Sequence, residues 1–159
     1  MKHILVATDF SDTASSAVAQ AAKLAAGAGA KLTLLHVIYA EKINETLLGL
    51  DAMEYLTRAV SSPLETHYSP SEAIDRLREA AQAKLDAAAA AIAEPRPTIA
   101  TAVGDGRPSD EVLKFAHENG VDLIVLGTHG RGAIGKALLG SVADHVIRLA
   151  ECPVMVVRN

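Results

Sequence analysis

Residues 121–142, with the sequence VDLIVLGTHGRGAIGKALLGSV, decide the fold. The first six of them are apolar on both faces apart from one aspartate, which is typical of a central parallel strand covered by helices on each side. Gly127 and Gly130 let the backbone turn and approach a ligand closely, and the helix that opens at Gly140-Ser141 offers free N–H groups to an anion. The stretch therefore predicts a strand, a glycine loop and a helix, with a phosphate site at the end of the strand.

Strands and helices alternate along the rest of the chain. We expect the other strands at His3–Thr8, Lys31–Val37, Thr98–Val103 and Val154–Val157, and the other helices at 12–28, 71–93 and 109–119. This alternation predicts an α/β fold, a single doubly wound, Rossmann-like five-stranded parallel sheet with right-handed crossovers. If the strand order is 3-2-1-4-5, a ligand binds beyond the ends of strands one and four, where the order reverses.

The segment at about residues 38–70 interrupts this pattern, because it is too long for an ordinary strand-to-helix connection. Its apolar residues have the spacing of a short amphipathic helix, which would form a flap over the site or a surface for a partner. A variable surface insertion is the other interpretation. Residues 1–159 are expected to form a single domain that contains this variable segment.

The composition argues against several classes of protein. A formal net charge of -4 and a pI near 5.8 do not suit a protein that holds nucleic acid, which normally needs a basic surface. The apolar run after Met1 stops at Asp9, so neither a signal peptide nor a membrane span of about 20 residues is expected, and the chain is expected to be cytoplasmic. The single cysteine, Cys152, is expected to be a small buried filler rather than a nucleophile.

Two well-known phosphate motifs overlap in the glycine loop, but neither fits its context. Residues 130–135 match the dinucleotide fingerprint G-x-G-x-x-G, which belongs after a first strand and needs an acidic residue about 20 positions later. Here the loop follows the fourth predicted strand, and one more strand comes after it. Residues 130–136 match G-x-x-x-x-G-K, yet Ala137 follows and has no hydroxyl for the magnesium ion of a P-loop. We interpret both matches as coincidental.

A third pattern fits throughout. Gly127-x-x-Gly130, nine further residues and then Gly140-Ser141 resemble the nucleotide-binding motif of the universal stress protein family, in its ATP-binding branch. The resemblance extends to ILVATDFS at 4–11, LLHV at 34–37 and PVMVV at 153–157, so it covers nearly the whole chain except residues 38–70. It implies an adenine nucleotide alpha hydrolase-like fold with strand order 3-2-1-4-5, ATP as the ligand, and a homodimer formed through Val154–Val157.

The resemblance also implies the residues of the site. Adenosine is expected to contact Ala7, Thr8, Asp9 and Val37. The ribose and the phosphates are expected to contact Gly127, Thr128, His129, Gly130, Arg131, Gly132, Ala133, Gly140, Ser141, Val142 and Ala143. Some family members have proline at the position of Ala7, a departure that affects only a backbone contact. A divalent ion, Mg²⁺ or Mn²⁺, would arrive with the phosphates, with Asp9 as the nearest carboxylate.

Some charged residues near the site have two interpretations. Arg131 and Lys136 either contact phosphate or point to solvent. Asp105 and Arg107 either reach a ligand or belong only to a glycine turn. The imidazole of His129 is interpreted as a structural or ligand-edge group rather than a base.

The sequence favours a nucleotide-dependent regulatory protein of the stress-response type over an enzyme. It contains no recognisable catalytic constellation and too little chain for a substrate domain. A slow ATPase, or a nucleotide-transferring enzyme of the same fold, is the main alternative. A nucleotide-free dimerisation module is a third hypothesis, against which the intact glycines Gly127, Gly130 and Gly140 count.

Overall fold

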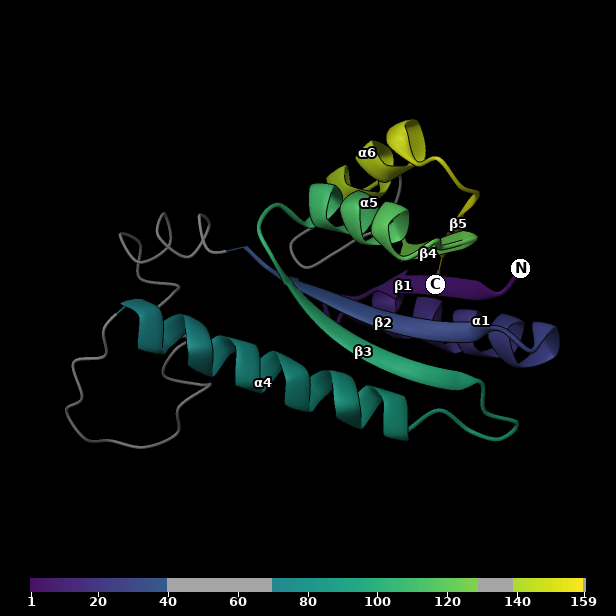
Figure 1. The fold of residues 1–159 in the computed structure, drawn as a ribbon, viewed down its shortest axis with the longest axis horizontal. Helices are drawn as coiled ribbons and strands as arrows, with labels where there is room; N and C mark the ends of the chain where they lie inside the picture. Colours follow the sequence, from purple (N-terminus) through teal and green to yellow (C-terminus); the bar gives the residue numbers. More distant parts are fainter. Residues whose placement is uncertain (40–69, 129–138, 159) are drawn as a thin grey trace.

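A computed structural model describes residues 1–39, 70–128 and 139–158, which form a five-stranded sheet with helices on both faces (Figure 1). The strands are β1 (His3–Ala7), β2 (Lys31–Ile38), β3 (Thr98–Asp105), β4 (Leu123–Gly127) and β5 (Val154–Val157). The helices are α1 (Asp12–Ala28), α4 (Pro70–Ala90), α5 (Pro108–Glu118) and α6 (Ser141–Leu149).

The sheet is parallel throughout, and its order β3-β2-β1-β4-β5 confirms the predicted order 3-2-1-4-5. β1 is the central strand, because its Ile4 pairs with Leu32 of β2 on one side and with Leu123 of β4 on the other. Helices α1 and α4 pack in one core cluster, and α5 and α6 pack in the cluster on the opposite face (Figure 1). This is the doubly wound arrangement that the sequence predicts.

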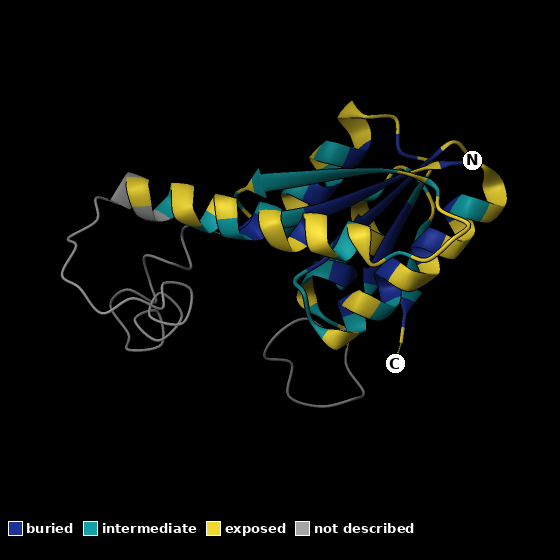
Figure 2. Ribbon diagram, turned by 90° about the horizontal axis from the view of Figure 1, so that it is seen from below, coloured by how far each residue is buried: buried dark blue, intermediate teal, exposed yellow. Residues whose placement is uncertain are grey.

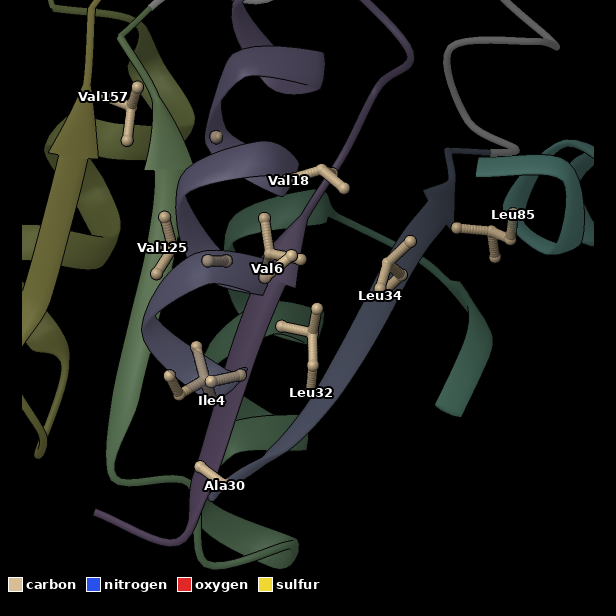
Figure 3. Close-up of a cluster of buried hydrophobic side chains, with 13 residues drawn as sticks. Ile4, Val6, Val18, Ala30, Leu32, Leu34, Leu85, Val125 and Val157 are labelled. Atoms are coloured by element: carbon tan, nitrogen blue, oxygen red, sulfur yellow. The ribbon is translucent and has the colours of Figure 1, made fainter. Parts of the chain in front are cut away.

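Alanines bring α1 close to the sheet. Ala17, Ala21 and Ala25 recur every fourth residue on one side of the helix and are completely buried. Because their side chains are short, the helix lies directly on the large buried residues of the strands. That cluster includes Ile4, Val6, Leu32, Leu34 and Val125 from the sheet and Leu85 from α4 (Figure 3). Burial of each larger aliphatic side chain contributes about 1.5–3 kcal/mol, so this layer anchors β1 and β4 firmly.

The second core cluster lies on the other face, as the alternation of side chains along a strand requires. Leu5, Leu35 and Ile124 point to this face and pack with Val112 of α5 and Val146 of α6. β1 is therefore buried on both sides, which explains why its sequence is a continuous apolar run rather than an alternating one.

Cys152 lies at the rim of this second cluster and is half-buried. Burial raises the pKa of its thiol, and the nearby carboxylates of Asp122 and Glu151 act in the same direction. A raised pKa keeps the sulfur in its unreactive thiol form. The position suits a packing residue, as predicted, although the side chain is only partly enclosed.

The ends of α1 follow the capping rules. Ser11 precedes the helix, and its hydroxyl accepts a hydrogen bond of 3.3 Å from the Ala14 N–H. Gly29 ends the helix in the left-handed conformation, with φ of 61°, and its N–H bonds to the carbonyls of Ala25 and Ala26. Gly27 lies inside the helix.

Two element boundaries differ from the predictions. Helix α4 begins at Pro70 and ends at Ala90, so it starts one residue earlier than predicted, and the last turn expected up to Ala93 is not helical. Strand β3 continues to Asp105 rather than Val103, because it keeps pairing with the long β2 as far as Ile38. The predicted glycine turn therefore begins later, at Gly106, whose φ of 121° does require glycine.

Part of α4 projects past the sheet, and only its later turns belong to the core (Figure 2). Ala81 and Leu85 are the buried residues of this helix in the described chain. The predicted amphipathic segment before α4 lies outside the described residues, except for Ile38, Tyr39 and Pro70. None of the described helices is both long enough and apolar enough to span a membrane.

Candidate functional site

The ends of β1 and β4 form the centre of the candidate site. Val6 pairs with Val125, so one strand reaches Thr8 at about the level where the other reaches Gly127. The chain leaves β1 toward β2 on one side, and β4 lies on the other side, so the strand order reverses between them. In doubly wound sheets the crevice beyond such a reversal is where ligands bind.

At the end of β1, hydrogen bonds fix the chain as it turns into α1. The Thr8 N–H donates to the Leu35 carbonyl at 2.9 Å, and the Thr8 hydroxyl accepts from the Phe10 N–H at 3.0 Å. The Asp9 carboxylate follows, and its Oδ1 accepts from the Ser11 N–H at 3.1 Å and from the Ser11 hydroxyl at 2.6 Å. The half-buried carboxylate is thus held over the first turn of α1 with a defined orientation.

Phe10 and His36 complete this turn, and neither is among the predicted site residues. Phe10 has φ of 64°, a conformation that a bulky residue seldom adopts. Its ring centroid lies 4.6 Å from that of His36, and the Lys84 ammonium lies 5.6 Å from the same ring. His36 Nδ1 lies 2.8 Å from the Thr8 carbonyl oxygen. The only sequence signal for this arrangement is a histidine among the apolar residues 34–38 at the end of β2.

At the end of β4, backbone contacts join the loop to the start of α6. The Thr128 N–H donates to the Val157 carbonyl at 2.9 Å, and the Gly140 N–H donates to the Thr128 carbonyl at 2.7 Å. Gly140 is the N-cap residue of α6 and provides no side-chain cap. The N–H groups of the first helical turn, those of Ser141, Val142 and Ala143, have no acceptor within the helix and are the usual donors to an anion.

A carboxylate also lies in this first turn of α6. Asp144 accepts hydrogen bonds from Arg148 one turn later, at 3.1–3.2 Å, to both of its oxygens. Donating these hydrogen bonds to the Asp144 carboxylate raises the pKa of the Arg148 guanidinium, which stays positive. The pair offsets the negative charge that would otherwise oppose an anion at this end of the helix.

Ten of the predicted site residues are described, and they gather at the carboxyl-terminal ends of the parallel strands. They are Ala7, Thr8, Asp9 and Val37 at the ends of β1 and β2, Gly127 and Thr128 at the end of β4, and Gly140, Ser141, Val142 and Ala143 at the start of α6. The others, His129, Gly130, Arg131, Gly132 and Ala133, lie outside the described residues, as does Lys136.

The residues at and after the end of β3 lie further from the centre of the candidate site. Val37 sits beside Gly104, since a Cβ on that glycine would lie 3.5 Å from Val37 Cγ2. Asp105 ends the edge strand β3 and forms an ion pair with Arg78 of α4, while Arg107 is the N-cap residue of α5. Asp105 is therefore two strands away from β1 and already has a cationic partner, which favours its interpretation as a structural residue.

Comparison with known proteins gives consistent matches. The sequence profile of the universal stress protein family matches residues 1–158. The chain is 33% identical to universal stress protein YxiE of Bacillus subtilis, over 98% of this chain and 97% of that one.

Solved structures agree with this match. That of protein MJ0577, a universal stress protein of Methanocaldococcus jannaschii, superposes with a TM-score of 0.74 at 28% identity and covers 99% of this chain and 96% of the other. A universal stress protein in complex with cAMP superposes with a TM-score of 0.57 at 27% identity, over 98% of this chain and 95% of the other.

Proposed function

Because the chain belongs to the universal stress protein family, we propose that it binds ATP beyond the ends of β1 and β4 and acts as a nucleotide-dependent regulatory protein. The observation that carries the proposal is the start of α6, where a helix without a side-chain cap begins beside the end of β4. The relative solved with cAMP binds an adenine nucleotide, which supports this class of ligand.

The phosphates are assigned to the first turn of α6 and to the glycine loop before it. The N–H groups of Ser141, Val142 and Ala143 would donate to one phosphate, and the Ser141 hydroxyl adds a donor. The Gly140 N–H is not assigned to the phosphate, because it already donates to the Thr128 carbonyl. The contribution of Gly140 would be the lack of a side chain at the position where the phosphate approaches.

The adenosine is assigned to the other wall of the crevice, at the ends of β1 and β2. Asp9 would accept from the ribose or the base, and the backbone near Ala7 and Val37 would line the base. The ion, Mg²⁺ or Mn²⁺, is proposed to arrive with the phosphates, because such ions commonly keep phosphate and water ligands rather than an all-protein cage.

Calorimetric titration with ATP and MgCl₂ tests the proposal, using wild type, Gly140→Val and Gly27→Val. The backbone at Gly140, with φ of -64° and ψ of 149°, suits any residue, so valine should leave the fold intact while its branched side chain blocks the phosphate. We expect affinity to fall at least about tenfold, equivalent to about 1.4 kcal/mol. Gly27→Val is the control, because Gly27 is exposed in α1 with nothing within 4 Å of an added Cβ.

The same titration identifies the nucleotide. ATP, AMP and cAMP share the adenosine but differ in their phosphates, so a preference for ATP over AMP measures what the phosphate wall contributes. A wild-type protein that takes up none of the three, or a Gly140→Val variant with unchanged affinity, would reject the site.

The proposal includes a homodimer formed through β5. This strand is an edge of the sheet, and its Val154, Met155 and Val156 remain partly exposed. Two further apolar side chains on α6 are exposed, Ile147 by 46% and Leu149 by 57%. An apolar edge strand with unpaired backbone groups favours pairing with a strand of another chain. Pairing with β5 of a second copy, related by a two-fold axis, covers both edge strands at once and closes the assembly as a dimer.

A further inference from the structure

We infer that His36 is a positioning residue of the nucleotide site, which holds the turn carrying Asp9 in the geometry that the ligand needs. This inference rests on the proposed function, since Asp9 is assigned to the adenosine. His36 itself is not assigned to the ligand. It acts through the residues on either side of Asp9, namely Thr8 and Phe10.

The first contact is a hydrogen bond from β2 to the end of β1. His36 Nδ1 lies 2.8 Å from the Thr8 carbonyl oxygen. A carbonyl oxygen only accepts hydrogen bonds, so Nδ1 must carry the proton and the ring is fixed in that tautomer or in the charged form. Thr8 is one residue past the end of β1, so its carbonyl lies where the chain leaves the strand and turns toward α1.

The second contact holds Phe10 in an unfavourable backbone conformation. A φ of 64° costs free energy for a bulky residue, and such residues persist only where the surroundings over-determine them. Three contacts do so here: the Phe10 N–H bonds to the Thr8 hydroxyl at 3.0 Å, the ring lies 4.6 Å from the His36 ring, and the Lys84 ammonium lies over it. His36 takes part in the stacking as well as in the bond to Thr8.

Asp9 therefore lies between Thr8 and Phe10, and the imidazole of His36 restrains both of these residues. Its carboxylate is held from the far side by Ser11, whose N–H and hydroxyl both donate to Oδ1. A site held in its binding geometry before the ligand arrives avoids the ordering cost that a loose turn would impose on binding. Strained residues cluster at ligand sites for this reason, and Phe10 is the described non-glycine residue with positive φ.

Two substitutions separate the two contacts of His36. His36→Phe keeps a flat ring to stack on Phe10 but has no donor for Thr8. His36→Asn places an amide N–H near the position of Nδ1 but has no ring. We expect His36→Phe to weaken ATP binding about tenfold, the usual effect of losing one hydrogen bond, and His36→Asn to recover much of that loss. His117→Asn, at an exposed histidine of α5 paired with Glu151, is the control.

Two measurements on the nucleotide-free protein keep the test independent of ATP. The ¹⁵N shifts of the His36 ring should report a protonated Nδ1 in wild type. Hydrogen exchange of the Phe10 and Ser11 amides should be faster in His36→Phe than in wild type, while amides of α5 are unchanged.

Weaker binding in His36→Phe, partial rescue in His36→Asn and a protonated Nδ1 support the inference. Equal losses in both variants that simply follow their lower thermal stability would overturn it, as would unchanged affinity in His36→Phe. Absence of ATP binding by wild type would instead reject the proposed function and with it the binding role of His36. In that case, unchanged amide exchange in His36→Phe would also reject the restraint on the turn.

Discussion

Gly127 packs so closely on Thr13 that a side chain at residue 127 would crowd the first turn of α1. A Cβ built on Gly127 would lie 3.0 Å from Thr13 Cγ2, 3.1 Å from the Thr13 carbonyl carbon and 3.2 Å from the Ala14 nitrogen. Two of these three neighbours are backbone atoms, which cannot rotate away. The end of β4 and the start of α1 are thus packed directly against one another beside the candidate site.

We expect Gly127→Ala to destabilise the protein by about 1–3 kcal/mol, the usual cost of forcing extra atoms into a packed contact. The measurement is the urea midpoint followed by circular dichroism. Gly27→Ala is the matched control and should change stability in the opposite direction. Gly27 lies in the interior of α1 with open space around it, so alanine should stabilise the helix by about 0.5–1 kcal/mol. Equal stability of Gly127→Ala and wild type would mean that the two elements can move apart freely.

The lowered pKa of Asp122 leads us to expect that the stability of the protein depends on pH. Hydrogen bonds from the backbone N–H groups of Lys2 and His3 lower the pKa of this carboxyl group in the folded state. A depressed folded pKa stabilises the protein at pH values above the ordinary aspartate pKa of about 3.9, and this contribution is lost as the pH falls through the folded pKa. Wild type should therefore be more stable than Asp122→Asn at pH 7, and the difference should shrink below about pH 4.

Unfolding by urea between pH 3 and pH 7 measures this difference. Glu118→Gln, at an exposed carboxylate near the end of α5, serves as the control and should show a smaller difference. The difference in unfolding free energy between wild type and Asp122→Asn could instead stay constant from pH 3 to pH 7. In that case the negative charge of Asp122 would not be what stabilises its bonds to Lys2 and His3.

The sequence predicts the sheet well because the pattern of each strand depends mainly on its own residues. β1 is a continuous apolar run because both of its faces are covered, and the alanine spacing of α1 reveals the side that packs on it. The strand order follows from the alternation of strands and helices once the family motif is recognised. The end of β3 is not predictable in this way, because its last two residues are held by pairing with Val37 and Ile38.

The candidate site is only partly predictable for the same reason. Gly127 is expected from close approach of a ligand, but its contact with Thr13 gives a second reason that depends on how α1 packs. The bond between His36 and Thr8 joins residues 28 positions apart, and Phe10, in its left-handed conformation, contacts the His36 ring and Lys84 from α4. No local pattern encodes such contacts, since a phenylalanine is a poor signal for positive φ.

The proposed dimer predicts that a charge on β5 separates the subunits. Val156→Lys places an ammonium on the partly exposed edge strand, so pairing with a second copy would bury an unpaired charge. We expect the mass measured by light scattering at micromolar concentration to fall to that of one chain. Thr98→Lys, at the exposed start of the opposite edge strand β3, should leave the dimer intact. A wild type that is already monomeric would count against the interface.

The last prediction is that the protein holds ATP rather than consuming it quickly. Fast hydrolysis needs a positioned water, a group that orients it and charge stabilisation at the γ-phosphate. The two carboxylates described near the proposed site are already engaged, Asp9 with Ser11 and Asp144 with Arg148. Backbone donors bind the ground state about as well as the transition state, and such uniform binding gives little acceleration. Turnover should therefore be far below the typical enzyme value of about 10 per second.

Phosphate release at saturating ATP and Mg²⁺ measures this turnover, and His129→Ala, in the loop outside the described residues, should leave any residual rate unchanged. A rate of about one per second or more that disappears in His129→Ala would identify an enzyme instead of a nucleotide-dependent regulator.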